Sequence, residues 1–314
     1  MGMLRLMVAF AVPIMLGGLV AGIVYQPLAA ALRPWLIVFI VTTLALAVMR
    51  TDLLTLTAVL RRPGATMVQV IWLLALSPLV MFGVLLLVPV PEALRGPLIL
   101  YAATAPITSM PAFALLFRLD AAFVLIGVTA AALLSPFTVP ATAAIVMGDQ
   151  ISIGIVDLGI RMAMIIGGCY ALGLLLRRVF GPRRIAGWSL QLNAIFVVAA
   201  TLLGMAVMDG IVALALRDPG AMILTVGLLL GVCFLLFLLG MVLFLPAGWT
   251  TALGAGLNSG GRNISIVLAV VGASASDALI IVVAAAQIPI FVLPILQKPL
   301  IRYIMERQAP PESG

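Results

Sequence analysis

The stretch "GLNSGGRNISIVLAVVG", residues 256 to 272, lies where a membrane-spanning helix is expected, yet its first half is polar or rich in glycine. Its first eight residues contain three glycines, two asparagines, a serine and Arg262. A charged side chain in the middle of a bilayer costs roughly 2.5 to 3.5 kcal/mol even on insertion scales, so it usually serves a function. The stretch therefore predicts a broken span with a polar site at the break.

The composition of the whole chain indicates a membrane protein. Hydrophobic residues fill 65% of the 314 positions, charged residues fill 9%, and the mean hydropathy is +1.33. No soluble globular domain of this length has such values. The net charge of +7 comes from basic residues that stand singly or in pairs between apolar runs, so we expect no nucleic-acid partner. The sequence predicts an all-α, polytopic protein that is integral to the lipid bilayer.

Ten apolar stretches have about the 20 residues that cross roughly 30 Å of hydrocarbon. Between them, twelve basic residues fall on one side of the membrane and four on the other, which predicts cytoplasmic termini in a bacterial-type inner (plasma) membrane. The first stretch also resembles a secretory signal, but we expect it to remain as a span. The stretches are approximately 7–24, 33–49, 66–88, 94–117, 121–147, 155–176, 188–208, 220–245, 248–272 and 277–301.

Three features recur at nearly one offset along the chain. Pro136 and Pro140 of the fifth span precede Pro289 and Pro294 of the tenth by 153 and 154 residues. The polar interruptions of the fourth and ninth spans start 152 residues apart, at 104 and 256. This predicts two related five-helix repeats, the second inverted because five is odd, with broken, crossed helices 4 and 9. The units are 1–150, 151–307 and a disordered tail, 308–314.

The residues at the two interruptions predict how each span breaks. In the fourth span Pro106 removes an amide hydrogen, Thr108 and Ser109 offer capping oxygens, and a second proline suits the first turn of a new helix. In the ninth, Asn258 and Ser259 are expected to cap a helix from about residue 262 to 271. Both restarts would point positive dipole ends at the bilayer midplane, where an anion could bind.

The candidate substrate site follows from these breaks. For Arg262 there are two interpretations: it binds an anion, or it snorkels or pairs with a helix carbonyl in a structural role. The two asparagines either bind substrate or tie the half-helices together. The predicted substrate-binding residues are Thr108, Ser109, Asn258, Ser259, Arg262 and Asn263.

The acidic residues all lie at or near predicted span ends, and the chain has no histidine. Any coupling ion must therefore be held by hydroxyls, amides and carbonyls, unless these groups make ordinary interhelical hydrogen bonds. Cys169 and Cys233 lack metal-ligand spacing, so we expect no metal site and no cofactor, and Na⁺ is the candidate coupling ion. The candidate ion-binding residues are Thr104, Thr129, Ser135 and Gln287.

Several stretches resemble the bile acid:sodium symporter family. They are "LLTLTAVLRRPGATMVQVIWLLALSPLVMF" (53–82), "AATAP" (102–106), "RLDAAF" (118–123) and "NSGGRNISIVLAV" (258–270). The resemblance covers most of the chain and implies ten helices in an inverted-repeat fold with crossed fourth and ninth helices. It also implies a midplane site for an organic anion, and a panel of two helices per repeat that rocks against a helical bundle.

The chain departs from this family at the sodium ligands. Leu73, Leu253, Met110 and Pro111 stand at the positions aligned with four of them, and only Asn258 carries over. The resemblance therefore implies the fold and an organic-solute site, whereas sodium coupling is not implied by these residues.

We expect a secondary transporter for a small or medium organic anion, and not an enzyme, because the chain has no nucleotide-binding loop or catalytic triad. Two alternatives stay open at this point. The protein is an efflux carrier for an organic acid or oxyanion, or it is a non-transporting membrane sensor or subunit on the same fold. No obligate partner is evident in the sequence.

Overall fold

The computed structural model describes residues 2–51, 63–147 and 154–308, and in these ranges every regular element is helical. The helices are α1 (Gly2–Ala9), α2 (Ala11–Val24), α3 (Gln26–Leu32), α4 (Leu36–Arg50), α6 (Pro63–Ile71), α7 (Ser77–Leu87), α8 (Glu92–Ala103), α9 (Met110–Leu116), α10 (Ala121–Val146), α11 (Ile155–Gly187), α12 (Ser189–Val207), α13 (Ile211–Arg217), α14 (Pro219–Leu243), α15 (Trp249–Gly260), α16 (Ser265–Val271) and α17 (Asp277–Gln308). Short helical turns join several of them, among them the π-helical turn η2 (Trp72–Leu76).

Among the described residues, seven helical segments are long and apolar enough to cross a membrane, and eight if α1 and α2, bent by 74°, form one span. These long apolar helices indicate an integral, multi-pass membrane protein. The two remaining predicted spans are the interrupted ones, in which neither half is long enough to cross alone. The count of ten spans therefore stays a prediction.

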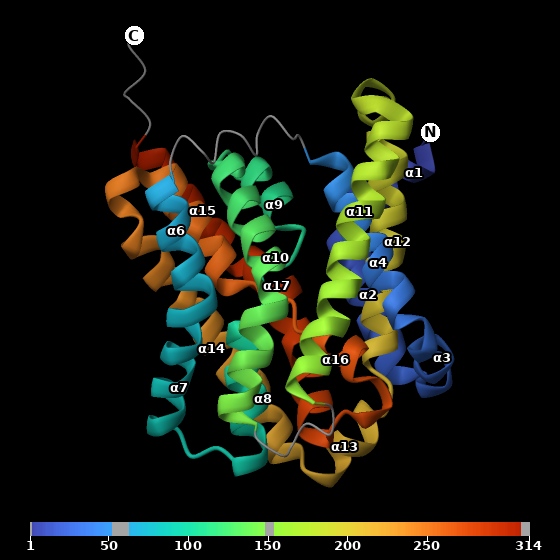
Figure 1. Ribbon diagram of the computed structural model, residues 1–314, viewed down its shortest axis with the longest axis vertical. Helices are drawn as coiled ribbons and strands as arrows, with labels where there is room; N and C mark the ends of the chain where they lie inside the picture. Colours follow the sequence, from blue (N-terminus) through green and yellow to red (C-terminus); the bar gives the residue numbers. More distant parts are fainter. Residues whose placement is uncertain (1, 52–62, 148–153, 309–314) are drawn as a thin grey trace.

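The helices form two bundles that stand side by side (Figure 1). The panel bundle consists of α1 to α4, α11 and α12, and the crossing bundle consists of α6 to α10, α14, α15 and α17. The short helix α16 contacts α4 and α11 of the panel bundle and α17 of the crossing bundle. The chain changes bundle between α4 and α6, between α10 and α11, and between α12 and α14. Each half of the chain therefore contributes helices to both bundles.

Capping carboxylates mark the starts of two long helices in the crossing bundle. Asp120 accepts a hydrogen bond from the Phe123 amide at the start of α10 (3.0 Å), and Asp218 accepts one from the Ala221 amide at the start of α14 (2.8 Å). Each satisfies an amide that has no partner within the first turn of its helix. These acidic residues lie at helix ends, as the sequence predicts.

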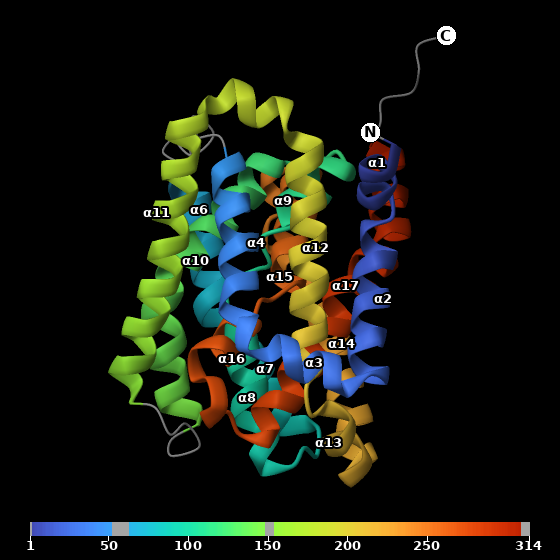
Figure 2. The same ribbon diagram turned by 90° about the vertical axis from the view of Figure 1, so that its right-hand side faces the viewer.

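The helix α11 is longer than the predicted span at 155–176. It continues through the basic residues to Gly187, with a bend at Gly181, whose φ of 74° lies in the left-handed region that favours glycine. Figure 2 shows this end of α11 arching over toward α12. The apolar stretch predicts only the part that lies in hydrocarbon, whereas helical geometry continues into the polar part.

The helices α14 and α15 pack closely through glycines. A Cβ added to Gly256 would lie 2.7 Å from the carbonyl oxygen of Phe237, and one added to Gly260 would lie 2.9 Å from that of Cys233. Small residues four positions apart let helix backbones approach in this way in membranes. The close approach fixes α15, which ends at the break in the ninth predicted span.

Three predictions concern residues outside the described ranges. They are the boundary between the repeats near residue 150, the Arg61–Arg62 pair of the family-like loop, and residues 309–314 of the predicted tail. Residue 308, the first residue of that tail, is the last residue of α17.

Candidate functional site

The two interrupted segments meet at the centre of the crossing bundle. The segment 104–109 separates α8 from α9, and the segment 261–264 separates α15 from α16. They run antiparallel and form a bridge at Pro106 and Arg262. The amide of Ile107 donates to the carbonyl of Gly261 (3.2 Å), and the amide of Asn263 donates to that of Ala105 (2.9 Å). We call this arrangement the crossing.

The crossing gives hydrogen-bond partners to backbone groups that would be unpaired in an irregular segment inside a membrane. Buried amides and carbonyls without partners cost several kcal/mol each in hydrocarbon, so such segments occur only where protein or water satisfies them. Here each break donates one backbone hydrogen bond to the other. The predicted breaks at both places are present, and the predicted proline in the first turn of α9, Pro111, is there as well.

A cavity of about 380 Å³ lies between the two bundles, next to the crossing. We call it the large cavity. Its lining extends from the crossing to Val8 in α1, Leu116 in α9 and Asn193 in α12. Thr108, Ser109 and Asn263 line it, as do Ser265 and Gln287. The panel bundle supplies Val8, Ala11, Val12, Met15, Thr43, Asn193, Phe196, Val197, Ala200 and Leu203.

The polar groups of the large cavity are neutral. The Gln287 amide nitrogen donates to the Ser265 hydroxyl (3.2 Å) and to the carbonyl of Val283 (3.0 Å). On the opposite wall, Asn193 accepts a hydrogen bond from the guanidinium of Arg50. Phe113, Phe196 and Phe291 add aromatic surface to the lining. Such a mixture of apolar wall and a few polar groups is typical of small-molecule sites.

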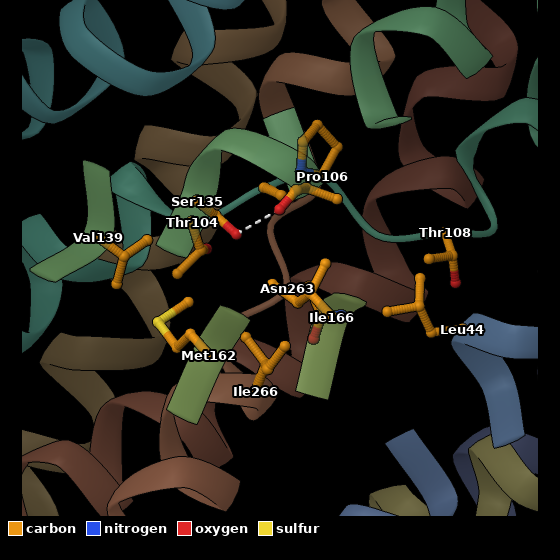
Figure 3. A pocket seen from close by; sticks show the side chains of 12 residues that line it. Leu44, Thr104, Pro106, Thr108, Ser135, Val139, Met162, Ile166, Asn263 and Ile266 are labelled. Atoms are coloured by element: carbon orange, nitrogen blue, oxygen red, sulfur yellow. Dashed lines mark hydrogen bonds between the residues drawn. The ribbon is translucent and has the colours of Figure 1, made fainter. Parts of the chain in front are cut away.

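A small cavity of about 30 Å³ lies on the other side of the same segments (Figure 3). Thr108 and Asn263 line both cavities, whereas Thr104 and Ser135 line only the small one. Figure 3 shows Met162 and other apolar side chains of the panel bundle facing these groups. A water molecule needs roughly 10 to 15 Å³, so the small cavity has room for one.

Arg262 does not face either cavity. Its side chain is fully buried, and its guanidinium points back into the crossing bundle. The four acceptors are the carbonyls of Ser259 (3.1 Å), Leu73 (3.0 Å) and Thr104 (3.1 Å) and the hydroxyl of Ser77 (2.6 Å). No ion pair joins it to a carboxylate in the part of the chain that the structure describes.

The π-helical turn η2 is part of the same network. The Ser77 hydroxyl donates to the carbonyl of Trp72 (2.8 Å), and the Trp72 indole donates to the Ser259 hydroxyl (2.7 Å). The Ser259 hydroxyl in turn donates to the carbonyl of Ala255 (2.6 Å). In an α-helix the Leu73 carbonyl would accept from the Ser77 amide, but here that amide donates to the Trp72 carbonyl and Pro78 has no amide hydrogen, and the Leu73 carbonyl accepts from Arg262.

Asn258 and Ser259 do not cap α16. The helix α15 continues through Gly260, and α16 begins at Ser265 without a side-chain cap. Asn258 is fully buried in the last turn of α15, and its amide nitrogen donates to the carbonyl of Val124 in α10 (2.9 Å). The predicted restart near residue 262 and its cap are therefore wrong, because the two glycines end α15 later than the polar pair suggests.

Buried amide groups lie behind α15, away from the cavities. The Asn258 side-chain oxygen has no hydrogen-bond partner among the described residues, and neither do the two polar atoms of the Gln69 side chain. Gln69 is fully buried and lies against Gly127 of α10. The positions that the family resemblance aligns with sodium ligands, Leu73 and Leu253, are fully buried apolar residues.

The four candidate ion-binding residues are not brought together. Thr104 and Ser135 line the small cavity, but their hydroxyls donate to the carbonyls of Tyr101 (2.7 Å) and Ala132 (2.8 Å). Gln287 lines the large cavity. Thr129 lies beside Tyr170 of α11 and lines neither cavity. These side chains make the interhelical and local contacts that the sequence leaves open as an alternative.

Sequence reasoning missed several polar residues of this region. Trp72, Ser77 and Gln69 lie in an apolar run that has a central proline, Pro78, but no polar interruption. Thr43 and Asn193 lie in panel helices. The one available signal is that Gln69 and Ser77 are isolated polar residues in a span, and such residues usually face other helices.

The site offers hydrogen-bond donors and acceptors around a cavity at the meeting point of two bundles, next to a buried positive charge. Such an arrangement can bind and release a solute without covalent chemistry. No model of a known protein family matches the chain, and no curated protein matches its sequence.

Proposed function

We propose that the protein is a secondary transporter that carries a small or medium organic anion across the membrane by alternating access. The observation that carries this proposal is the cavity of about 380 Å³ between the panel bundle and the crossing bundle. Sites for small molecules have volumes of about 300 to 1,000 Å³, so a compact organic solute fits. Its position between two bundles is where rocking of one against the other would expose it to either side.

The distribution of the halves over the bundles supports an inverted repeat. The panel bundle takes two predicted spans from residues 2–50 and two from residues 155–207. The crossing bundle takes three from residues 63–146 and three from residues 219–308. Equal shares and an antiparallel bridge between the two breaks are expected if each half has five spans and the second is inverted. On this basis we propose ten spans.

The sequence resemblance and these features together lead us to propose membership of the bile acid:sodium symporter family. Because twelve basic residues fall on the predicted side of both termini and four on the other, we propose that the end holding both described chain ends is cytoplasmic. The large cavity extends toward the same end, as expected of an inward-facing state. The membrane would be a bacterial-type inner (plasma) membrane.

Charge supports an anion over a cation. No residue that lines the large or small cavity is acidic, and the donors there are hydroxyls and amides. Thr108, Ser109 and Asn263 can donate to a carboxylate, because their side-chain donors face the cavity from the crossing. Arg262, one residue before Asn263, places a positive charge behind this wall. An anion in the cavity is therefore attracted without contacting Arg262.

Uptake by the purified protein in proteoliposomes tests this function. The substrates are labelled carboxylates of increasing size, from small monocarboxylates to bile acids. We expect saturable uptake of at least one. Because a hydrogen bond to a charged group contributes about 1.5 to 3 kcal/mol, Thr108→Ala and Asn263→Ala should each lower kcat/KM by about tenfold or more.

The matched control is Thr142→Ala. The Thr142 hydroxyl donates to the carbonyl of Thr138 within α10 and lines neither cavity. This variant should transport like the unmodified protein. If no carboxylate is taken up saturably, or if Thr108→Ala transports as well as Thr142→Ala, the proposed function is wrong.

A further inference from the structure

Arg262 occupies a site whose surroundings are those of a cation site. Its guanidinium meets three carbonyl oxygens and one hydroxyl oxygen, from Ser259, Leu73, Thr104 and Ser77. Neutral oxygens of this kind are also the ligands that hard metal cations take in proteins. We call these four groups the oxygen shell.

The oxygen shell joins three separate parts of the crossing bundle. Ser259 lies at the end of α15, Leu73 and Ser77 lie in and after η2, and Thr104 begins the break after α8. A cation held among them therefore ties both broken segments to the span that contains η2. Coupling cations in transporters are held in the same way, by unwound carbonyls near the midplane.

The charge of Arg262 is not compensated by a carboxylate. The ion pairs in the described ranges lie at the helix ends, as between Arg33 and Asp209 (2.8 Å). Tyr101 and Cys233 interact electrostatically with Arg262 and form a hydrogen bond with each other (3.0 Å). A buried positive charge without a counter-ion is costly in a membrane. A bound anion in the adjacent cavity would lower that cost.

We propose that Arg262 is a built-in cation, which fills the oxygen shell permanently and lets the carrier bind its anion without a coupling metal ion. The role of Arg262 in uptake rests on the proposed transport function. The identification of the oxygen shell as a cation site does not. The arginine is thus a positioning residue, since it lies behind the cavity wall and does not contact substrate.

The first experiment measures the melting temperature of the purified protein in choline, sodium and potassium chloride at constant ionic strength. The unmodified protein should melt at the same temperature in all three, because its shell is already filled. A rise in sodium alone would overturn the inference. It would point instead to the unpaired side-chain oxygens of Gln69 and Asn258 as ligands of a separate cation.

The second experiment empties the shell with Arg262→Ala. The variant should melt about 5 °C or more below the unmodified protein. Methylguanidinium chloride at millimolar concentration should raise the melting temperature of Arg262→Ala by about 3 °C and leave the unmodified protein unchanged, because a ligand stabilises only a site that is vacant. If none of methylguanidinium, sodium and potassium raises the melting temperature of Arg262→Ala by more than it raises that of the unmodified protein, the shell is not a cation site.

A second variant keeps the inference testable if Arg262→Ala does not fold. Arg262→Lys keeps the charge but reaches fewer of the four oxygens, so it should melt at a lower temperature than the unmodified protein. Sodium should not change the melting temperature of this variant. Sodium-dependent stability of Arg262→Lys would contradict the inference. In the uptake assay, Arg262→Ala should regain at least part of its lost transport with methylguanidinium.

These readouts separate the two proposals. Melting temperatures need no substrate, so rescue of Arg262→Ala by methylguanidinium with no carboxylate uptake by any form would refute the transport function alone. Saturable uptake that needs sodium in the unmodified protein would refute the built-in cation and leave the transport function intact.

Discussion

Single residues at the crossing show how a buried charge is stabilised without a counter-charge. Arg262 donates to four neutral oxygens, and three of these belong to residues whose side chains make further hydrogen bonds, Ser77, Ser259 and Thr104. Ser77 donates to Trp72, and Trp72 donates to Ser259. Hydrogen bonds in such a network strengthen one another in a medium of low dielectric constant. Removing one member should therefore be measurable in the stability of the whole protein.

Trp72→Phe removes the indole donor to Ser259 while keeping an aromatic ring. The buried Ser259 hydroxyl then loses one partner, which should cost about 1 kcal/mol and lower the melting temperature by about 2 to 4 °C. Trp35→Phe is the control, because Trp35 is 56% exposed. Equal melting temperatures for both variants would show that the indole hydrogen bond does not contribute to stability.

The sequence predicts which residues matter at the crossing better than it predicts where they point. Thr108 and Asn263 line both cavities, whereas Asn258, Ser259 and Arg262 face helices behind α15. A polar residue beside a break is expected to meet polar surroundings, and all five do. The direction of each side chain depends on the turn at which α15 ends, and cap patterns do not fix that turn.

At the scale of elements, the two breaks could be predicted and the π-helical turn could not. Proline, glycine and polar residues interrupt the fourth and ninth spans, and such signals are local. For the turn η2 the local signal is less specific, because Pro78 follows it by two residues and removes one amide hydrogen, but no glycine-rich or polar stretch interrupts the span. The Leu73 carbonyl accepts from Arg262, which is 189 residues away along the chain. The proline indicates an irregular helix, but it does not indicate which distant side chain binds the freed carbonyl.

Gly256→Ala tests the close packing of α15 on α14. The new methyl group would lie 2.7 Å from the backbone oxygen of Phe237, so the two helices must separate. Overpacking costs about 1 to 3 kcal/mol, and the melting temperature should fall by about 3 to 10 °C. Gly231→Ala on α14 is the control, since a Cβ there would meet no atom within 4 Å. A fall of the same size in both variants would contradict this account.

At the scale of the whole molecule, the large cavity reaches the end of the bundles that holds both described chain ends. Composition alone predicts the helical, membrane-integral character of the chain. The division into a panel bundle and a crossing bundle came only from the family resemblance, because apolar stretches do not show which helices pack together. That division is what places a cavity between the bundles.

Access to the cavity can be measured with a single cysteine. The two native cysteines, Cys169 and Cys233, are fully buried and should not react with an impermeant maleimide. Ala112→Cys lines the large cavity and is exposed, so it should be labelled in inside-out vesicles and not in right-side-out vesicles. Ala131→Cys, at a fully buried position of α10, is the control.

An anion that binds in the cavity should slow labelling of Ala112→Cys. Labelling from the opposite side only would mean that the end holding the chain termini is not cytoplasmic, or that the cavity opens the other way. Labelling of Ala131→Cys at the same rate would mean that the protein is unfolded under the conditions of the experiment.

The backbone pairing at the crossing also sets an order of events during synthesis. The Ile107 amide and the Ala105 carbonyl find their partners at Gly261 and Asn263, which the ribosome adds about 150 residues later. At about 5 to 20 residues per second, the first break waits roughly 8 to 30 s for the second. During that interval the nascent first half holds unpaired backbone groups within the bilayer. Membrane insertion of this chain therefore needs water, lipid headgroups or an insertase to pair with the backbone groups of the first break until the second break is synthesised.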